Sequence, residues 1–338
     1  MRILVTGGTG YIGSHTVLEL VAAGHDVIIA DNYSNSKPES MHRICELAGR
    51  SIPFELCELC DRDAVIRLFD AHDIDAVIHF AGLKAVGESV KKPLLYYQNN
   101  ILSTLNLLFA MQVHGVHGLV FSSSATVYGA PSTVPIRENS PTNNVTSPYG
   151  RTKLMIEDIL RDIASANADM SVVLLRYFNP VGAHPSGRIG EDPNGVPNNL
   201  MPYIARVAVG KLEMLPVYGN DYPTPDGTGV RDYIHVVDLA AGHVAALQKL
   251  DQPGVYTYNL GTGIGCSVLE VIEAYRKASG QAIPYQIMPR RPGDVPAYYA
   301  DSSLAYTELG WKAQRSLYDM CADSWHFQNN NPDGYGNG

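Results

Sequence analysis

Two side chains that could share a proton, a phenol and an ammonium, stand four residues apart at Tyr149 and Lys153. Residues at this spacing lie on one face of a helix. A tyrosine has a reference pKa near ~10, so it serves as a base at neutral pH only where positive charge favours its phenolate. A serine run, 122–124, follows a strand-like segment and could hold a substrate hydroxyl. Together these residue types predict proton transfer between an alcohol and a ketone.

Each of these signals also has an ordinary structural explanation when it is taken alone. A Tyr-x-x-x-Lys pair is often an exposed pair on a helix, and a serine run often begins a turn after a strand. The chemical interpretation therefore depends on whether the chain also has a binding site for a redox cofactor near Tyr149. The first residues of the sequence supply a candidate for such a site.

Three glycines near the N-terminus, Gly7, Gly10 and Gly13, follow the apolar run 3–5 and precede a helical pattern. In a strand–turn–helix unit the first would allow the turn, the second would admit a pyrophosphate, and the third would let helix and strand pack closely. The helix N-terminus would then face the anion. The spacing differs from the commoner G-x-G-x-x-G, and a glycine-rich turn without a ligand is the alternative.

A second strand-like run, 25–31, ends in Asp31, near the distance from the glycines at which an acidic residue meets ribose hydroxyls. A carboxylate accepts hydrogen bonds from a diol and repels a 2′-phosphate, so we expect NAD rather than NADP as the cofactor. The alternative for Asp31 alone is a strand-end residue that starts a turn with Asn32.

Strand-like runs alternate with helical patterns, which predicts an α/β protein built on a doubly wound parallel Rossmann sheet. From residue 180 onward prolines and glycines become frequent, which predicts a smaller, loop-rich C-terminal α/β lobe. We expect domains at 1–179 and 180–338, with the chain crossing back around 230–262. A polar tail, 329–338, is expected to be frayed. The runs are 2–6, 26–30, 53–59, 76–81, 118–122 and 171–177 for strands, and 63–72, 101–113, 154–166 and 268–279 for helices.

Composition limits the class of protein. The chain has 338 residues, 45% of them hydrophobic and 17% charged, with a formal net charge of −9. These values fit a globular protein and give no basic surface for nucleic acid. No apolar run approaches the ~20 residues of a membrane span, and a strand beginning at residue 2 leaves no room for a signal peptide, so we expect a cytoplasmic protein. Five scattered cysteines, with Cys57-x-x-Cys60 as their closest pair, predict neither a disulfide framework nor a metal site.

Six segments carry a resemblance to a known family: 79–89, 121–129, 147–153, 176–184, 198–202 and 226–236. Over almost its full length the chain resembles the extended short-chain dehydrogenase/reductase family, in the branch that epimerises UDP-galactose and UDP-glucose. The resemblance implies an isomerase of galactose metabolism that inverts carbon 4 of a UDP-hexose through a 4-keto intermediate. Hydride would move to bound NAD and return to the other face of the sugar, with no net redox change.

The resemblance also implies residue roles. Tyr149 would be the acid/base, Ser124 its catalytic partner, and Lys153 would bind the nicotinamide ribose and depress the Tyr149 pKa. The cofactor would be bound by Gly7, Gly10, Tyr11, Ile12, Gly13, Asp31, Asn32, Asn35, Ser36, Glu58, Leu59, Phe80, Ala81, Lys84, Asn99, Ser122, Tyr149, Lys153, Tyr177 and Phe178. The substrate would be bound by Ser124, Tyr149, Asn179, Asn199, Leu200, Tyr218, Arg231, Tyr233, Arg291, Asp294 and Tyr298. The family usually has Asp at the position of Glu58, where it contacts the adenine. Glu58 keeps the charge on a longer side chain, so this departure affects only the adenine contact.

Several alternatives stay open at this point. Arg231 and Arg291 would hold the diphosphate, but Arg231 could instead pair with a neighbouring aspartate. Tyr298 would fill the space beside carbon 2 of the sugar, unless Tyr299 faces the sugar instead. A nucleotide-sugar 4,6-dehydratase shares the first step, and a non-catalytic NAD-sensing protein could share the fold. By resemblance alone, the helices at 101–113 and 154–166 would pair two copies into a homodimer.

Overall fold

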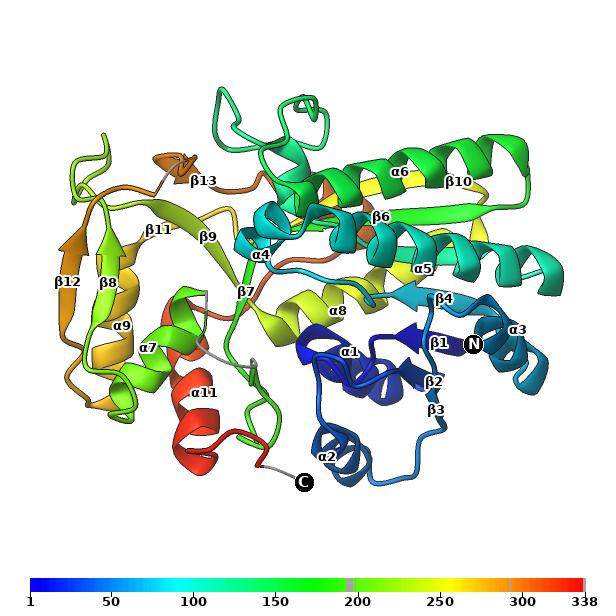
Figure 1. Ribbon diagram of the computed structural model, residues 1–338, viewed down its shortest axis with the longest axis horizontal. Helices are drawn as coiled ribbons and strands as arrows, with labels where there is room; N and C mark the ends of the chain where they lie inside the picture. Colours follow the sequence, from blue (N-terminus) through cyan, green and yellow to red (C-terminus); the bar gives the residue numbers. More distant parts are fainter. Residues whose placement is uncertain (193–196, 198, 292, 337–338) are drawn as a thin grey trace.

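A seven-stranded parallel sheet is the largest feature of the part of the chain that the structure, a computed structural model, describes: residues 1–192, 197, 199–291 and 293–336 (Figure 1). The middle residues of the central strands are apolar and buried, as with Ile3, Leu4 and Val5 of β1, which is expected where helices cover both faces of a parallel sheet. The strand order is β10 (Gly254–Leu260), β6 (Ser171–Tyr177), β5 (Gly118–Ser122), β4 (Ala76–His79), β1 (Arg2–Thr6), β2 (Asp26–Asp31) and β3 (Phe54–Leu56).

Two layers of helices cover this sheet (Figure 1). One apolar cluster joins the sheet to α1 (Tyr11–Ala22), α2 (Pro38–Ala48) and α8 (Val236–Ala246). The opposite cluster joins it to α3 (Arg62–Ala71), α5 (Pro93–His114) and α6 (Pro148–Ala166). The predicted doubly wound α/β class is therefore confirmed. Short helical segments lie between these elements at α4 (Val86–Lys91), η1 (Ala125–Tyr128), η2 (Leu247–Asp251) and α10 (Ser303–Leu309).

The remaining strands form smaller sheets on the other side of the molecule (Figure 1). β9 (Val230–His235) pairs with β7 (Asn179–Val181), β11 (Gly265–Ser267) and β13 (Ala297–Tyr298), and β8 (Leu215–Tyr218) pairs with β12 (Tyr285–Met288). A separate apolar cluster packs them against α7 (Leu200–Ala208), α9 (Val268–Ser279) and α11 (Leu317–Asn330). None of the described helices is long and apolar enough to cross a membrane.

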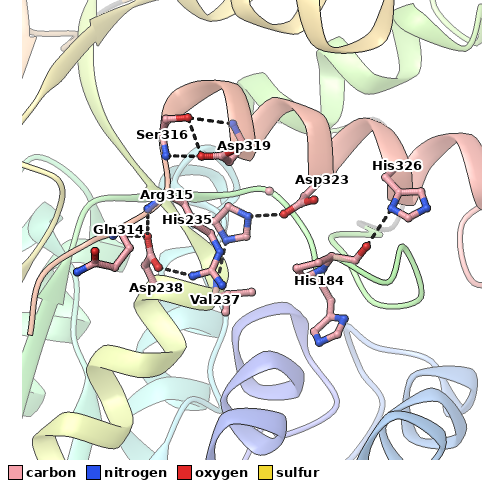
Figure 2. A network of polar contacts seen from close by, with 12 residues as sticks. His184, His235, Val237, Asp238, Gln314, Arg315, Ser316, Asp319, Asp323 and His326 are labelled. Atoms are coloured by element: carbon pink, nitrogen blue, oxygen red, sulfur yellow. Dashed lines mark hydrogen bonds and ion pairs between the residues drawn. The ribbon is translucent and has the colours of Figure 1, made fainter.

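A buried polar network lies where β9, a strand of the smaller sheets, passes into α8, a helix of the large sheet (Figure 2). His235 donates through Nε2 to Oδ2 of Asp323 in α11, at 3.1 Å. Asp238 in α8 accepts from the backbone N–H groups of Gln314 and Arg315, both at 2.8 Å, and from the Arg315 guanidinium. These contacts tie the segment before α11 to a helix of the large sheet.

The C-terminal tail was expected to be frayed, but Asn331 and Tyr335 pack against distant segments, whereas Pro332 and Asp333 between them are exposed. Asn331 is buried, and its side-chain oxygen accepts from Nη1 of Arg43 in α2 at 2.6 Å. The Tyr335 hydroxyl hydrogen-bonds to both backbone groups of Gly190, at 3.1 Å each. The polar tail finds its partners in distant segments of the chain, so its composition alone gave a misleading signal. Residues 337–338 lie outside the described residues.

Candidate functional site

The phenol and the ammonium predicted to share a face of a helix lie on the first turns of α6. Pro148 opens this helix, and the Ser147 hydroxyl caps it by accepting from the Gly150 N–H at 3.2 Å. Tyr149 and Lys153 are both buried. The Lys153 Nζ lies 6.0 Å from the centroid of the Tyr149 ring and donates to the Ser122 carbonyl oxygen at 2.7 Å.

The serine run at the end of β5 meets this helix and β6. The Ser122 and Tyr177 hydroxyls are 2.8 Å apart. Ser124 caps η1, and its oxygen accepts from the Thr126 N–H at 3.2 Å and from the Thr126 hydroxyl at 3.0 Å. Because the Ser124 oxygen is the acceptor in both contacts, the Ser124 proton stays available for Tyr149 or for a substrate.

Burial is the largest influence on the pKa values of Tyr149 and Lys153, which with Ser124 form the proposed proton relay. Burial, with a smaller effect from Tyr177, raises the pKa of Tyr149 far above its usual value, and hydrogen bonding to Ser124 opposes this rise. Burial also lowers the pKa of Lys153 to about 8, and the charge of Glu157 opposes that fall. Tyr149 is therefore a neutral phenol in the protein alone. The expected effect of Lys153 on the Tyr149 pKa stays a prediction for the protein with its ligands bound.

The glycine-rich turn between β1 and α1 fits a dinucleotide. A Cβ on Gly13 would lie 2.2 Å from the Gly7 carbonyl oxygen, and Gly7 has φ of +69°. Gly10 occupies the N-cap of α1 without a side chain, so the first helix amides stay open to an anion. Asp31 closes β2 and is oriented by the backbone N–H groups of Thr9 (3.1 Å) and Tyr33 (2.8 Å).

The other predicted cofactor residues follow β2, β3 and β4 or lie on α1 and α5. Asn32 donates to Glu58 at 2.7 Å, which brings together two residues predicted to contact adenosine. The side chain of Leu59 lies in the apolar core, and its carbonyl oxygen accepts from the Asn106 amide at 2.9 Å. Ser36 donates to Asp31, Asn35 is exposed, Phe80 and Ala81 follow β4, Asn99 lies on α5, and Ile12 packs in the core below the turn.

The predicted diphosphate-binding residues come together around one carboxylate. Asp294 accepts from Nε of Arg291 at 3.0 Å and lies 3.8 Å from Nη2 of Arg231. The Arg291 guanidinium also lies over the Tyr218 ring, 4.9 Å from its centroid. The alternative partner for Arg231 is therefore present in the protein without ligand, yet the same contact holds two guanidinium groups side by side.

The predicted sugar-binding residues come from four elements, β7, β9, β13 and α7. The Tyr298 hydroxyl donates to the Ala125 carbonyl oxygen at 2.5 Å, and its ring lies 5.5 Å from that of Phe178. The Asn179 amide donates to the Asp232 carbonyl oxygen at 2.9 Å. Tyr233 is buried on β9, and Leu200 begins α7 beside Asn199. Asn198, part of the same sequence segment, lies outside the described residues.

Glu191 was not predicted as a site residue, and it contacts both a predicted cofactor residue and a predicted substrate residue. Its Oε1 accepts from Nζ of Lys84 at 3.3 Å and from Nδ2 of Asn199 at 3.5 Å. Burial raises the pKa of Tyr11 well above its usual value and the charge of Glu191 adds to that rise, while the Tyr11 hydroxyl donates to the Gly182 carbonyl oxygen at 2.7 Å. A lone carboxylate in a proline- and glycine-rich loop gives no local signal, so only the folded chain reveals this contact.

Comparison with known proteins gives consistent results over the whole chain. A family model described as GDP-mannose 4,6 dehydratase matches residues 4–324. UDP-glucose 4-epimerase of Bacillus subtilis (strain 168) is 60% identical over 336 residues, covering 99% of each chain. UDP-glucose 4-epimerase of Mus musculus is 58% identical over 342 residues, again covering 99% of each. Among solved structures, UDP-glucose 4-epimerase from Bifidobacterium longum in complex with NAD+ and UDP has a TM-score of 0.96 and 57% identity, covering 99% of this chain and 100% of that one.

Proposed function

The chain belongs to the UDP-glucose 4-epimerases of the extended short-chain dehydrogenase/reductase family, and from this membership we infer that it inverts carbon 4 of UDP-galactose and UDP-glucose with NAD as its cofactor. The observation that carries this inference is the convergence of Tyr149, Lys153 and the 122–124 run at the end of β5. A phenol, an ammonium and a hydroxyl in this arrangement suit reversible oxidation of a secondary alcohol.

Tyr149 is the proposed acid/base, taking the proton of the sugar 4-hydroxyl and later returning it. NAD, when bound, supplies the hydride acceptor and donor for carbon 4. The Ser124 proton is available to hydrogen-bond the sugar oxygen as its charge changes, because other groups donate to the Ser124 oxygen. Burial of Tyr149 excludes water from the proton transfer and makes its ionisation depend on positive charge brought close by ligand binding.

NAD is the nucleotide that the turn after β1 and the end of β2 suit best. The open amides at the start of α1 suit the pyrophosphate, and Asp31 suits an unphosphorylated ribose diol. Tyr177 and Phe178 are the proposed neighbours of the nicotinamide, and Phe80, Ala81, Lys84 and Asn99 are proposed to line the cofactor. The cofactor-binding domain is proposed as 1–179 and the nucleotide-sugar domain as 180–338, with β10 contributed to the larger sheet from the second.

Arg231 and Arg291 are the proposed contacts of the UDP diphosphate. A guanidinium offers paired donors that match phosphate oxygens, and two of them beside Asp294 can exchange that partner for a diphosphate. Asn179, Asn199, Leu200, Tyr218 and Tyr233 complete the proposed substrate contacts.

A dehydratase is disfavoured, although the matching family model takes its description from one. The related dehydratases follow the active-site hydroxyl with an Asp-Glu pair, which eliminates water. Here Ala125 and Thr126 occupy those positions, and the Thr126 hydroxyl is directed at Ser124. Neither side chain can move a proton in an elimination.

A homodimer is proposed through α5 and α6. Apolar side chains of α5 are exposed along its length, with Leu94 76% and Val113 58% accessible, and a second copy would cover them. The mass in solution should be twice the 36.7 kDa of one chain. A monomeric mass would contradict the proposal. The exposed apolar set is Leu94, Leu95, Leu102, Leu105, Phe109 and Val113 of α5 with Met155 of α6.

We also propose a cytoplasmic location and a role in galactose metabolism.

The deciding experiment gives the purified protein UDP-galactose without any added cofactor. We expect UDP-glucose to form until the two sugars reach equilibrium, because NAD is regenerated in each turnover and stays with the protein. A 4-keto-6-deoxy product would support the dehydratase instead. Absence of any product from protein shown to contain NAD would overturn the proposed function.

A further inference from the structure

One carboxylate on the same helix as Tyr149 and Lys153 is enclosed by the protein. Glu157 is fully buried on α6, one helical turn beyond Lys153 and two beyond Tyr149. Its Oε1 accepts from the Ser123 hydroxyl at 2.6 Å and from Nε of Arg176 at 2.9 Å. Its Oε2 accepts from Nη2 of Arg176 at 2.6 Å, which makes the pair bidentate.

Two of the three side chains that contact the Glu157 carboxylate are next in sequence to a residue of the proposed site, and the third, Arg161, lies 3.4 Å from its Oε2 one turn further along α6. Ser123 lies between Ser122, whose carbonyl holds the Lys153 ammonium, and Ser124. Arg176 immediately precedes Tyr177, whose hydroxyl contacts that of Ser122. The carboxylate therefore links β5, α6 and β6 next to the residues of the proposed proton relay.

Arg176 also contacts the segment that follows Ser124. Its Nη1 donates to the Glu138 carbonyl oxygen at 3.1 Å, and its guanidinium lies 4.8 Å from the centroid of the Tyr128 ring. Tyr128 ends η1, the short helix that Ser124 caps. The segment that carries Ser124 is thus held from both ends by one ion pair.

We propose that Glu157 and Arg176 are positioning residues, which set the Ser124 hydroxyl, the Lys153 ammonium and the Tyr149 phenol in one reactive geometry. Packed apolar side chains in place of a buried ion pair often support folding equally well, so stability alone is a weak reason for this pair. Apolar side chains could not hold the Ser123 hydroxyl. The proposal rests on the proposed epimerase function, because it assigns these residues to that reaction.

The charge of Glu157 has a second consequence, at Lys153. The groups facing the ammonium are the Ser122 carbonyl and Phe121 ring of β5, Tyr149 and Glu157 of α6, and His79 of β4. Burial lowers the pKa of His79 to about 3, so this imidazole is neutral, whereas Glu157 favours the charged lysine. A neutral residue at 157 should therefore lower the Lys153 pKa and move the alkaline limit of activity to lower pH.

The test compares Glu157→Gln with Asp238→Asn in the full-length, NAD-loaded protein. Asp238 is a matched control because it is also a buried carboxylate with an arginine partner (Figure 2), but it lies on α8, which packs on the opposite face of the large sheet from α6. For Glu157→Gln we expect kcat for UDP-galactose to fall at least ~10-fold with KM changed by less than ~3-fold, and the alkaline limb to shift downward. For Asp238→Asn we expect a lower Tm with kcat and the pH profile unchanged.

Two further variants keep the test decisive if Glu157→Gln folds poorly. Ser123→Ala leaves the ion pair intact and removes one hydroxyl, so it should lower kcat several-fold without loss of folding, and Glu157→Asp should restore the alkaline limb. Wild-type kcat in both Ser123→Ala and Glu157→Gln would overturn the proposal. Equal losses in Asp238→Asn would also overturn it, since the effect would then be general. If the wild-type protein itself fails to epimerise UDP-galactose, the proposed function fails instead.

Discussion

Replacement of Tyr298 by cysteine should change which sugars the protein accepts. The Tyr298 hydroxyl donates to the Ala125 carbonyl oxygen at 2.5 Å, and its ring packs on Phe178 beside the proposed sugar site. An acetylated sugar carries its extra group on carbon 2, where by family resemblance this ring stands. We therefore expect the wild-type protein to turn over UDP-galactose and UDP-glucose efficiently and UDP-N-acetylglucosamine poorly.

The size of the effect follows from these contacts. Tyr298→Cys loses a hydrogen bond worth ~1 kcal/mol and an aromatic contact worth ~0.5–1.5 kcal/mol, so the variant should be less stable by roughly 1–3 kcal/mol. Even one excess methylene in a tight pocket is worth about 10–200-fold in kcat/KM. Since an N-acetyl group is larger than a methylene, we expect kcat/KM for UDP-N-acetylglucosamine to rise at least ~10-fold in the variant.

The neighbouring tyrosine is the matched control. The Tyr299 ring packs over β11, where a Cβ added to Gly265 would lie 3.0 Å from it. Tyr299→Cys should therefore cost stability without changing sugar preference. The assay is kcat/KM for plain and acetylated sugar pairs in all three proteins. Equal values for both pairs in the wild type, or admission of the acetylated sugar by Tyr299→Cys alone, would refute the reasoning.

Three further predictions concern the relay and the cofactor. Tyr149→Phe should lower turnover by about 10²–10⁴-fold while Tm and NAD content stay unchanged, and near-wild-type turnover would assign the proton to another group. Asp31→Ser should weaken the preference for NAD over NADP, as judged by mass spectrometry of the released nucleotide, and NADP as the main nucleotide of the wild type would contradict this role. Burial lowers the pKa of Lys153 to about 8, so its ammonium is lost above that pH and kcat should fall as pH rises through it. A profile that stays flat to about pH 10, the range of an unperturbed lysine, would show that its charge is not needed.

Local patterns were sufficient for the elements whose signal lies in a few adjacent residues. The apolar run before Gly7 indicates strand and turn without reference to the rest of the chain, whereas the predicted helix at 154–166 begins earlier, at Pro148. The predicted helix at 101–113 begins earlier, at Pro93, because polar side chains such as Asn99 and Asn100 obscure the apolar periodicity of its first turns.

Contacts between distant segments gave no such signal. Asn331 is polar and close to the C-terminus, and only its bond to Arg43 explains why it is buried. Glu157 could have been suspected, since it continues the helix face of Lys153 at a spacing of four residues. Its partner Arg176 comes from a strand, β6, so the pairing of the two buried charges follows from the fold and not from the sequence pattern.

The position of β10 at the edge of the large sheet has a consequence for synthesis on the ribosome. β6 emerges well before β10, which pairs with it along its full length from Gly254 to Leu260. At about 5–20 residues per second, the nascent chain exposes the unpaired edge of an apolar strand for several seconds. Such an edge is a template for pairing with other chains, so a nascent chain stalled before β10 should depend on chaperones that shield β6.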